Sequence, residues 1–250
     1  MEGKKNKISG LIALLIFPVF IATAQPKDLN DFQCAFSDSY REGNMGPWPG
    51  LIAEMEKIES PDLVWQTEIL KAIYGLVGYQ IGAGQKDLAK AYVKKADVRL
   101  EKLLTGYPRN ARLHSLAGAF YAYKISLNVY KAPFLGPKSL YHIEKSIELD
   151  PSEPMGYIEK GNSLLYRPAA FGGNKHEALV FYRKALKLME TQANWECNWQ
   201  QMLLRAFILK GLYETNQVAE AKMFTEQMQK EYGSMGWIKQ FVGANPMGKN

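Results

Sequence analysis

The sequence of 250 residues has few of the side chains on which most catalytic sites depend. It contains three histidines and two cysteines. His176 and Glu177 begin a pair typical of zinc proteases, but Val180 stands where that motif requires a second histidine. The glycines and the lysine of residues 82–86 lack the spacing of a phosphate-binding loop. We therefore expect no enzymatic activity, no metal site and no cofactor.

The two cysteines, Cys34 and Cys197, lie far apart in the sequence. A disulfide requires Cα atoms about 4.4 to 6.8 Å apart. The helical hairpins expected below place one cysteine in the first hairpin and the other in the last. In an open stack these hairpins are distant, so we expect two unpaired, mostly buried cysteines.

Charge of one sign is not concentrated anywhere in the sequence. The net charge is +6, and lysines alternate with glutamates along the expected helices. A nucleic-acid-binding protein would gather its basic residues on one face or in one block. We therefore do not expect a nucleic-acid partner.

Long apolar runs are missing except near the N-terminus, where three lysines within residues 4–7 precede the apolar residues 8–21. Small residues follow at 22–24, as a signal peptidase requires. We interpret residues 1–24 as a signal peptide cleaved after Ala24, which predicts a periplasmic or secreted protein. The alternative is a retained membrane anchor, but the run is shorter than the roughly 20 residues that span a bilayer. The nearest cysteine, Cys34, follows a polar stretch, so a lipoprotein is not expected.

Apolar residues recur at intervals of three and four, and no alternating strand pattern is present. Glycine and proline interrupt this pattern at regular intervals. The expected helices are residues 28–43, 49–58, 61–82, 86–105, 110–130, 138–149, 154–166, 175–190, 195–214 and 217–231, followed by a short one at 235–242. Short turns between ten helices indicate five antiparallel hairpins in an all-α protein.

Part of this pattern repeats. Pro108 and Pro151 are each followed ten residues later by a glycine, Gly118 and Gly161, where a neighbouring helix would come close. In the helices that follow, small residues recur seven positions apart: Ser139 with Ser146, and Ala178 with Ala185. Such spacing allows helices to cross closely.

These segments resemble tetratricopeptide repeats (TPR), most clearly at Tyr157, Gly161, Leu164, Ala178, Tyr182 and Ala185. The resemblance covers residues 111–233 and implies a right-handed α-solenoid of about five hairpins. We divide the chain into a signal peptide (1–24), degenerate hairpins (25–108), TPR-like repeats (109–233) and a capping helix with a tail (234–250). The residues expected to pack the repeats are Gly118, Tyr157, Gly161, Ala178, Tyr182 and Ala185.

The copies are longer than the 34-residue unit of the family. The surplus is assigned to two turns, residues 131–138 (KAPFLGPK) and 167–175 (RPAAFGGNK), which should be neighbours on one edge of the stack. In one interpretation, Phe134 and Phe171 fold back over the hairpin cores. In the other they form the lip of a binding site, together with Gly136, Gly172 and Gly173.

In repeats of this kind the first helix of each hairpin lines the concave face. The expected groove residues are Arg112, Ser115, Ala119, Tyr123, Met155, Ile158, Asn162 and Tyr166. The function expected is an exported scaffold that binds another protein or a peptide in this groove. Because the loop with Phe171 and the helix after it are also similar to periplasmic repeat proteins associated with TRAP transporters, the alternative is a transport-accessory or small-ligand-binding protein. A deep pocket between the middle hairpins would favour the alternative, and an open groove would favour the scaffold.

Overall fold

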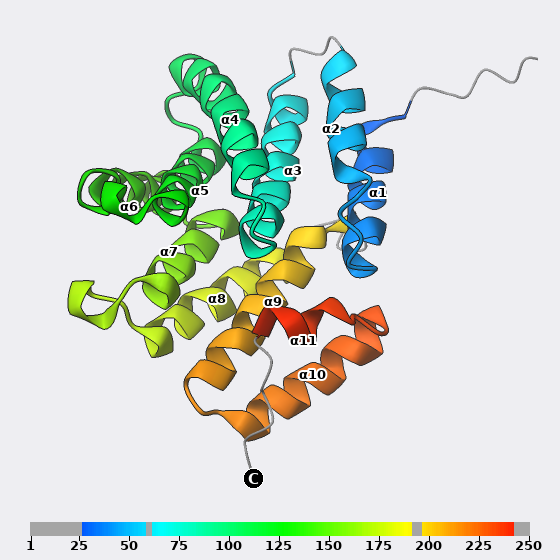
Figure 1. Ribbon diagram of the computed structural model, residues 1–250, viewed down its shortest axis with the longest axis vertical. Helices are drawn as coiled ribbons and strands as arrows, with labels where there is room; N and C mark the ends of the chain where they lie inside the picture. The colour runs from blue at the N-terminus through cyan, green and yellow to red at the C-terminus, as the bar shows by residue number, and fades with distance from the viewer. Residues whose placement is uncertain (1–26, 59–61, 192–196, 243–250) are drawn as a thin grey trace, which may run out of the picture.

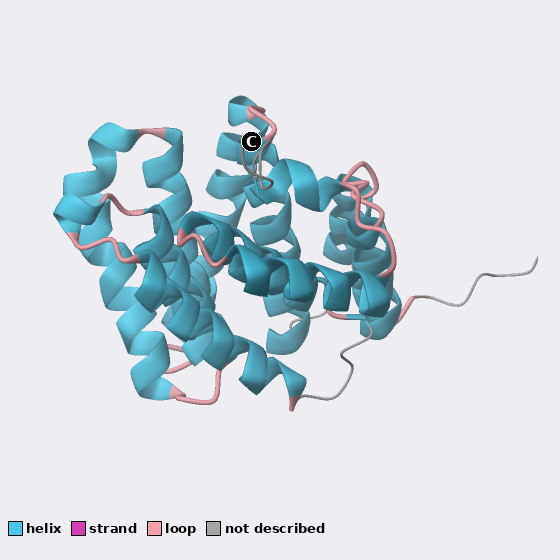
Figure 2. Ribbon diagram, turned by 90° about the horizontal axis from the view of Figure 1, so that it is seen from below, coloured by secondary structure: helices cyan, strands magenta, loops and turns pink. Residues whose placement is uncertain are grey.

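The computed structural model describes residues 27–58, 62–191 and 197–242 (Figure 1). Within these residues all regular structure is helical and no strand occurs (Figure 2). The α-helices are α1 (Leu29–Arg41), α2 (Trp48–Lys57), α3 (Leu63–Gly82), α4 (Lys86–Gly106), α5 (Ala111–Leu127), α6 (Ala132–Leu149), α7 (Pro154–Tyr166), α8 (Lys175–Glu190), α9 (Trp199–Glu214), α10 (Val218–Tyr232) and α11 (Trp237–Val242). Short 3₁₀ turns, η1 (Val129–Lys131) and η2 (Ala169–Phe171), precede α6 and α8.

The proposed signal peptide lies outside the described residues, as does the tail from residue 243. Across the described part of the chain, no helix combines the length and apolar character needed to cross a membrane.

Helix α6 begins six residues earlier than the sequence pattern predicts, so residues 132–138 are helical and do not form a loop. Pro133 lies in the first turn, where a backbone N–H has no partner inside the helix and proline is well tolerated. Pro137 lies one turn further on, still close to the start of the helix, where the missing N–H removes only one helical hydrogen bond. The expectation of a turn insertion at residues 131–138 is therefore wrong, because two prolines near a helix start do not prevent helix formation.

Close helix crossings hold the middle hairpins together. A Cβ atom on Gly118 of α5 would come within 2.7 Å of Ile143 in α6, and a Cβ on Gly161 of α7 would collide with the ring of Tyr182 in α8. The hydroxyl of Ser139 also donates a hydrogen bond to the carbonyl of Gly118, at 2.8 Å. Glycine is required at both crossings because any side chain would push the paired helices apart.

Successive helices run antiparallel, and the N-terminal ends of α5, α7 and α9 lie close together. Gly156 of α7 faces Ser146 of α6, and the start of α8 is joined to the end of α9 by the ion pair between Lys175 and Glu214, at 3.0 Å. The molecule therefore has two edges. We call the edge with the N-terminal ends of α5, α7 and α9 the start edge, and the edge with the turns after α3, α5, α7 and α9 the turn edge.

The two ends of the array meet, because α1 packs against α9. Cys34 of α1 forms a disulfide with Cys197, just before α9, with the two Cα atoms 4.4 Å apart. The expectation of two free cysteines is therefore wrong. It assumed an open stack, whereas the array curves until its first helix reaches α9 (Figure 1).

Aromatic side chains fill the space where the ends meet. The rings of Trp48 and Trp199 lie 5.1 Å apart, and those of Tyr40 and Trp237 lie 5.0 Å apart. Trp48 is completely buried. Large aromatic surfaces in contact stabilise such a junction through burial and ring packing.

Candidate functional site

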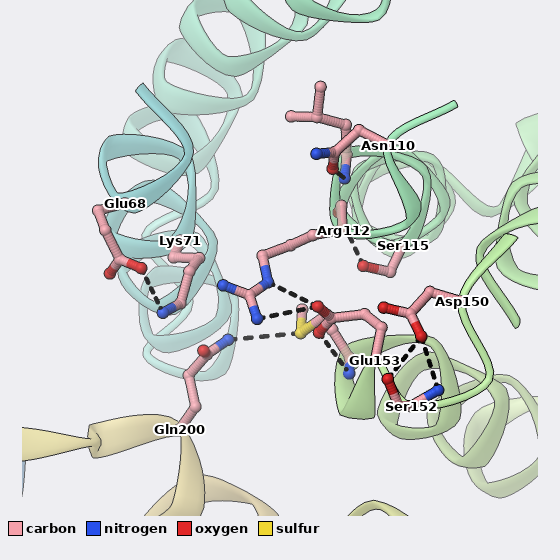
Figure 3. A network of polar contacts seen from close by, with 11 residues as sticks. Glu68, Lys71, Asn110, Arg112, Ser115, Asp150, Ser152, Glu153 and Gln200 are labelled. Atoms are coloured by element: carbon pink, nitrogen blue, oxygen red, sulfur yellow. Dashed lines mark hydrogen bonds and ion pairs between the residues drawn. The ribbon is translucent and has the colours of Figure 1, made fainter. Parts of the chain in front are cut away.

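A polar pocket of about 170 Å³ opens at the start edge, where α1, α3, α5, α7 and α9 converge. This space would hold several water molecules or one small ligand. We call it the start-edge pocket and define it by its charged and amide side chains, Glu68, Lys71, Arg112, Glu153 and Gln200 (Figure 3). Each comes from the start of its helix or, for α3, from its second and third turns.

Glu153 and Arg112 join the starts of α7 and α5. The guanidinium of Arg112 donates through Nε and Nη2 to one carboxylate oxygen of Glu153, at 2.9 and 2.8 Å. The other oxygen accepts a hydrogen bond from the backbone N–H of Met155, at 3.1 Å, and so caps α7. A charged acceptor at a helix N-terminus is favourable because the helix dipole is positive there. Glu153 thus fixes the direction in which Arg112 extends into the pocket.

Glu68 and Lys71 form a second ion pair on α3, at 2.7 Å, with both side chains largely buried. Burial alone would raise the pKa of Glu68, but the neighbouring Lys71 ammonium and hydrogen bonds from Lys71 and Gln33 outweigh burial and lower it. The carboxylate therefore stays charged. The pocket has two positive and two negative side chains, and its formal charge is balanced.

Gln200 lies in the first turn of α9 and faces the two ion pairs (Figure 3). Its amide donates to the thioether sulfur of Met155, at 3.4 Å. A thioether is a weak acceptor, so a ligand oxygen could readily replace it. The side chain of Asn198 does not cap α9, which leaves the positive end of that helix at the pocket.

The remaining wall of the pocket is apolar and covalently fixed. Phe36 and Trp199 line it, and so does Cys197 of the disulfide. The arrangement can therefore contact a ligand with both charges and with apolar surface. No group of metal-ligating side chains occurs within residues 27–58, 62–191 and 197–242.

The structure places the eight expected groove residues in different environments. Ser115, Ala119, Met155 and Ile158 are buried, and Arg112 belongs to the pocket. Tyr123 and Asn162 are partly buried, and Tyr166 is exposed. The set does not form one open concave surface, because α3 packs along α5 and Met155 faces the start of α9.

Tyr123 and Asn162 belong to a buried network around Glu159 of α7. Glu159 accepts hydrogen bonds from the hydroxyl of Tyr74, at 2.9 Å, and from the amide of Asn162, at 3.1 Å. Tyr182 donates to Asn162, at 2.8 Å, and Tyr123 donates to the carbonyl of Tyr74, at 3.1 Å. Burial, opposed by the two hydrogen bonds, raises the pKa of Glu159 to about 7.

The phenylalanines of the two surplus segments do not cover any core. Phe134, in α6, is 76% exposed, and Phe171, at the end of η2, is 74% exposed. The interpretation in which they fold back over the hairpin cores is therefore wrong. Gly136 lies within α6, whereas Gly172 has a φ of +88° and Gly173 lies where a Cβ would collide with the carbonyl of Arg167. The glycines of the second segment thus form a tight turn.

The residues expected to pack the repeats lie in the core: Gly118, Tyr157, Gly161, Ala178, Tyr182 and Ala185 are all buried. The tyrosine hydroxyl of Tyr157 donates to the carbonyl of Pro151, at 3.1 Å. This bond ties α7 to the turn that precedes it.

Glu68, Lys71, Glu153 and Gln200 are not among the site residues predicted from the sequence. One signal was available, since Glu68 and Lys71 are three residues apart within an otherwise apolar helix. Buried charges are rare unless they are paired, so this spacing indicates an internal ion pair. Glu153 and Gln200 gave no such signal, because their role depends on how distant helices meet.

Comparison with known proteins gives little beyond the fold. No family model matches the chain, and neither does any curated protein. The structure of the HusA haemophore from Porphyromonas gingivalis is similar, with a TM-score of 0.61 and 18% sequence identity. The match covers 77% of this chain and 96% of the haemophore. At this identity the likeness shows that the two chains share an all-helical fold.

Proposed function

We propose that this protein is an exported binding protein, periplasmic or secreted, in which TPR-like hairpins form a right-handed solenoid and hold a small polar ligand in the start-edge pocket. The position of the start-edge pocket is the observation that carries the proposal. It lies among the starts of the middle and last hairpins, and four of the residues expected to line an open groove are buried.

The chemistry of the pocket favours a small zwitterion. Lys71, Arg112 and the positive end of α9 suit a carboxylate, and Glu68 and Glu153 suit an ammonium group. A ligand with both charges can exchange partners with the existing ion pairs without leaving an unpaired charge. The volume of about 170 Å³ suits a molecule the size of an amino acid.

Haem fits this pocket poorly, although the similar structure is named as a haemophore. Haem is a large, mostly apolar macrocycle, whereas the pocket is small and lined by charges. The buried His114 and the partly buried His142 are hydrogen-bonded to each other through their Nδ1 atoms, at 2.9 Å. The likeness to the haemophore therefore supports a binding protein and not the same ligand.

The test is a screen of free amino acids and betaines against the mature chain, with thermal unfolding and calorimetry as readouts. A ligand at a hundred times its Kd should raise the free energy of unfolding by about 2.7 kcal/mol. We expect the paired change Glu68→Gln with Lys71→Met, which removes both charges together, to weaken binding at least tenfold.

The matched control is Asp87→Asn with Lys90→Met, which removes an exposed ion pair of the same spacing on α4. This control should bind like the unmodified protein. Failure of every small zwitterion to shift unfolding would overturn the proposal, as would equal binding by the pocket variant.

A protein or peptide partner is the second candidate, and it is favoured by Tyr166, which is 56% exposed at the end of α7. Replacing the exposed Tyr166 with Ser should then weaken capture of a partner from the cell envelope while the protein stays folded. The resemblance to TRAP-associated proteins would add a transporter component as the recipient of the ligand. Retained capture by the Tyr166 variant would contradict the scaffold role.

A further inference from the structure

The turn edge displays an unusual group of apolar side chains. Val129, Tyr130 and Phe134 are 69%, 87% and 76% exposed, and they lie within six residues of each other in η1 and the first turn of α6. Single exposed apolar residues are common on protein surfaces. Three such residues in one short segment, all largely exposed among the described residues, are characteristic of a surface that contacts another phase or molecule.

Positive side chains surround these residues. Lys131 and Lys138 flank Phe134, and neither forms an ion pair with a described residue. No aspartate or glutamate occurs from residue 128 to residue 143. The segment is therefore both apolar and cationic, with no carboxylate of its own to neutralise it.

The turn between α7 and α8 has the same composition. Tyr166 and Phe171 are exposed there, Arg167 is positively charged, and residues 160–176 contain no carboxylate. Lys175 adds a second positive charge, which is paired with Glu214 of α9. A hollow of about 290 Å³ beside this turn is lined by Arg167, Lys175 and His176, with Glu214 as its acidic member. Its size and charge suit a phosphate-bearing head group.

The two turns lie on the same edge because α5 and α7 are parallel. Arg112 and Glu153 bring the starts of these helices together at the opposite edge. Helix α6 runs antiparallel to both, since its Ile143 faces Gly118 and its Ser146 faces Gly156. Both helices therefore end at the turn edge, and the turn after each of them carries exposed aromatic residues together with basic residues.

We propose that the turn edge docks on the surface of an anionic phospholipid bilayer. Tyrosine and phenylalanine insert at the level of the head groups, and lysine and arginine contact lipid phosphates. A protein partner explains the combination less well. A protein interface usually has charges of both signs at its rim, whereas these two segments have an excess of positive charge and Glu214 is the acidic residue beside them.

The test uses the mature chain and vesicles of phosphatidylcholine with and without about 30% phosphatidylglycerol, separated by flotation. We expect binding to the anionic vesicles and weak binding to the neutral ones. Replacing Lys131 and Lys138 with Gln should weaken binding about 30-fold, and replacing Tyr130 and Phe134 with Ser should weaken it about tenfold. Raising the salt concentration to about 0.5 M should remove most of the charge-dependent binding to the anionic vesicles.

The matched control is Tyr107→Ser with Arg109→Gln, which removes an exposed aromatic and a cation from the turn between α4 and α5, at the start edge. This control should bind anionic vesicles as the unmodified protein does. All the changed side chains are exposed, so unchanged thermal unfolding shows that each variant is folded. The proposal is overturned if anionic vesicles do not bind, if the control loses binding equally, or if the turn edge captures a protein but no vesicle.

Discussion

Glu159 is a buried carboxyl group whose protonation should depend on folding. It is 2% exposed, and its hydrogen-bond partners Tyr74 and Asn162 are neutral. Burial disfavours the charged form, so the folded protein binds a proton at Glu159 more tightly than the unfolded chain does. The free energy of unfolding should therefore be highest below pH 4.5 for this group and should fall as the pH rises to about 7.

Replacing Glu159 with Gln should remove this dependence. A shift of this size corresponds to a contribution on the order of 3 kcal/mol between pH 4.5 and pH 7. We expect the free energy of unfolding of the variant, measured with urea, to exceed that of the unmodified protein increasingly as the pH rises through this range. Parallel pH profiles of the two proteins would contradict the prediction.

His142 has the opposite effect to Glu159 over part of the same pH range, because its contribution to the free energy of unfolding falls as the pH falls. Burial and the nearby His114 lower the pKa of His142 to about 4. Because the Nε2 atom of His114 donates to the carbonyl of Pro108, at 3.0 Å, its Nδ1 accepts from Nδ1–H of His142. Burial disfavours the charged imidazolium of His142, so stability from His142 is lost as the pH falls from about 6.5 to about 4. Both proteins retain His142, so the difference between the pH profile of the unmodified protein and that of the Glu159→Gln variant gives the contribution of Glu159 alone.

At the scale of elements, the sequence predicted most of the helices and where they cross. Periodicity and the prolines and glycines between helices placed α3, α4, α7 and α8 to within about two residues, because these signals are local. The start of α6 differs from the sequence-based expectation because proline is tolerated in the first turns of a helix, so Pro133 and Pro137 do not mark a loop. The pocket was missed because its side chains come from helices that meet only after folding.

One added methyl group where α7 crosses α8 should lower the free energy of unfolding. In Gly161→Ala the new Cβ would collide with the ring of Tyr182, which is completely buried and cannot move away. We expect a loss of about 2 kcal/mol in the free energy of unfolding.

Gly50→Ala is the matched control, because the added Cβ meets no atom within 4 Å beyond its chain neighbours and the position is within α2. It should be neutral or stabilise by up to about 1 kcal/mol through helix propensity. Urea denaturation of both variants checks the pair. Equal effects at the two positions would show that the crossing is less tightly packed than described.

At the scale of the whole molecule, the disulfide joins the two ends of the array. Cys34 and Cys197 are 163 residues apart, so the bond restricts the unfolded chain strongly. Replacing both cysteines with Ala should lower the free energy of unfolding by about 4 kcal/mol.

Urea denaturation of the oxidised protein and the double variant measures this change. Reduction of the unmodified protein should produce a similar loss, and it should leave the double variant unaffected. Ligand binding should weaken in both cases, because Cys197 lines the start-edge pocket. A disulfide-free protein of undiminished stability would contradict this account.

The positions of the turn edge and the start edge determine how the protein would be oriented on a bilayer. With the turn edge against a bilayer, the start-edge pocket faces away from the lipid, because the two lie at opposite ends of α5 and α7. A ligand could then enter from the aqueous side while the protein stays bound to the surface.

The bond between Cys34 and Cys197 also makes the intervening chain a closed ring. A protease that cuts once between these residues leaves two fragments that remain covalently attached. Such a nicked protein should migrate as one band on a denaturing gel and separate into two only after a reductant is added. A protein exposed to envelope proteases would in this way survive a first cut with both of its edges still joined.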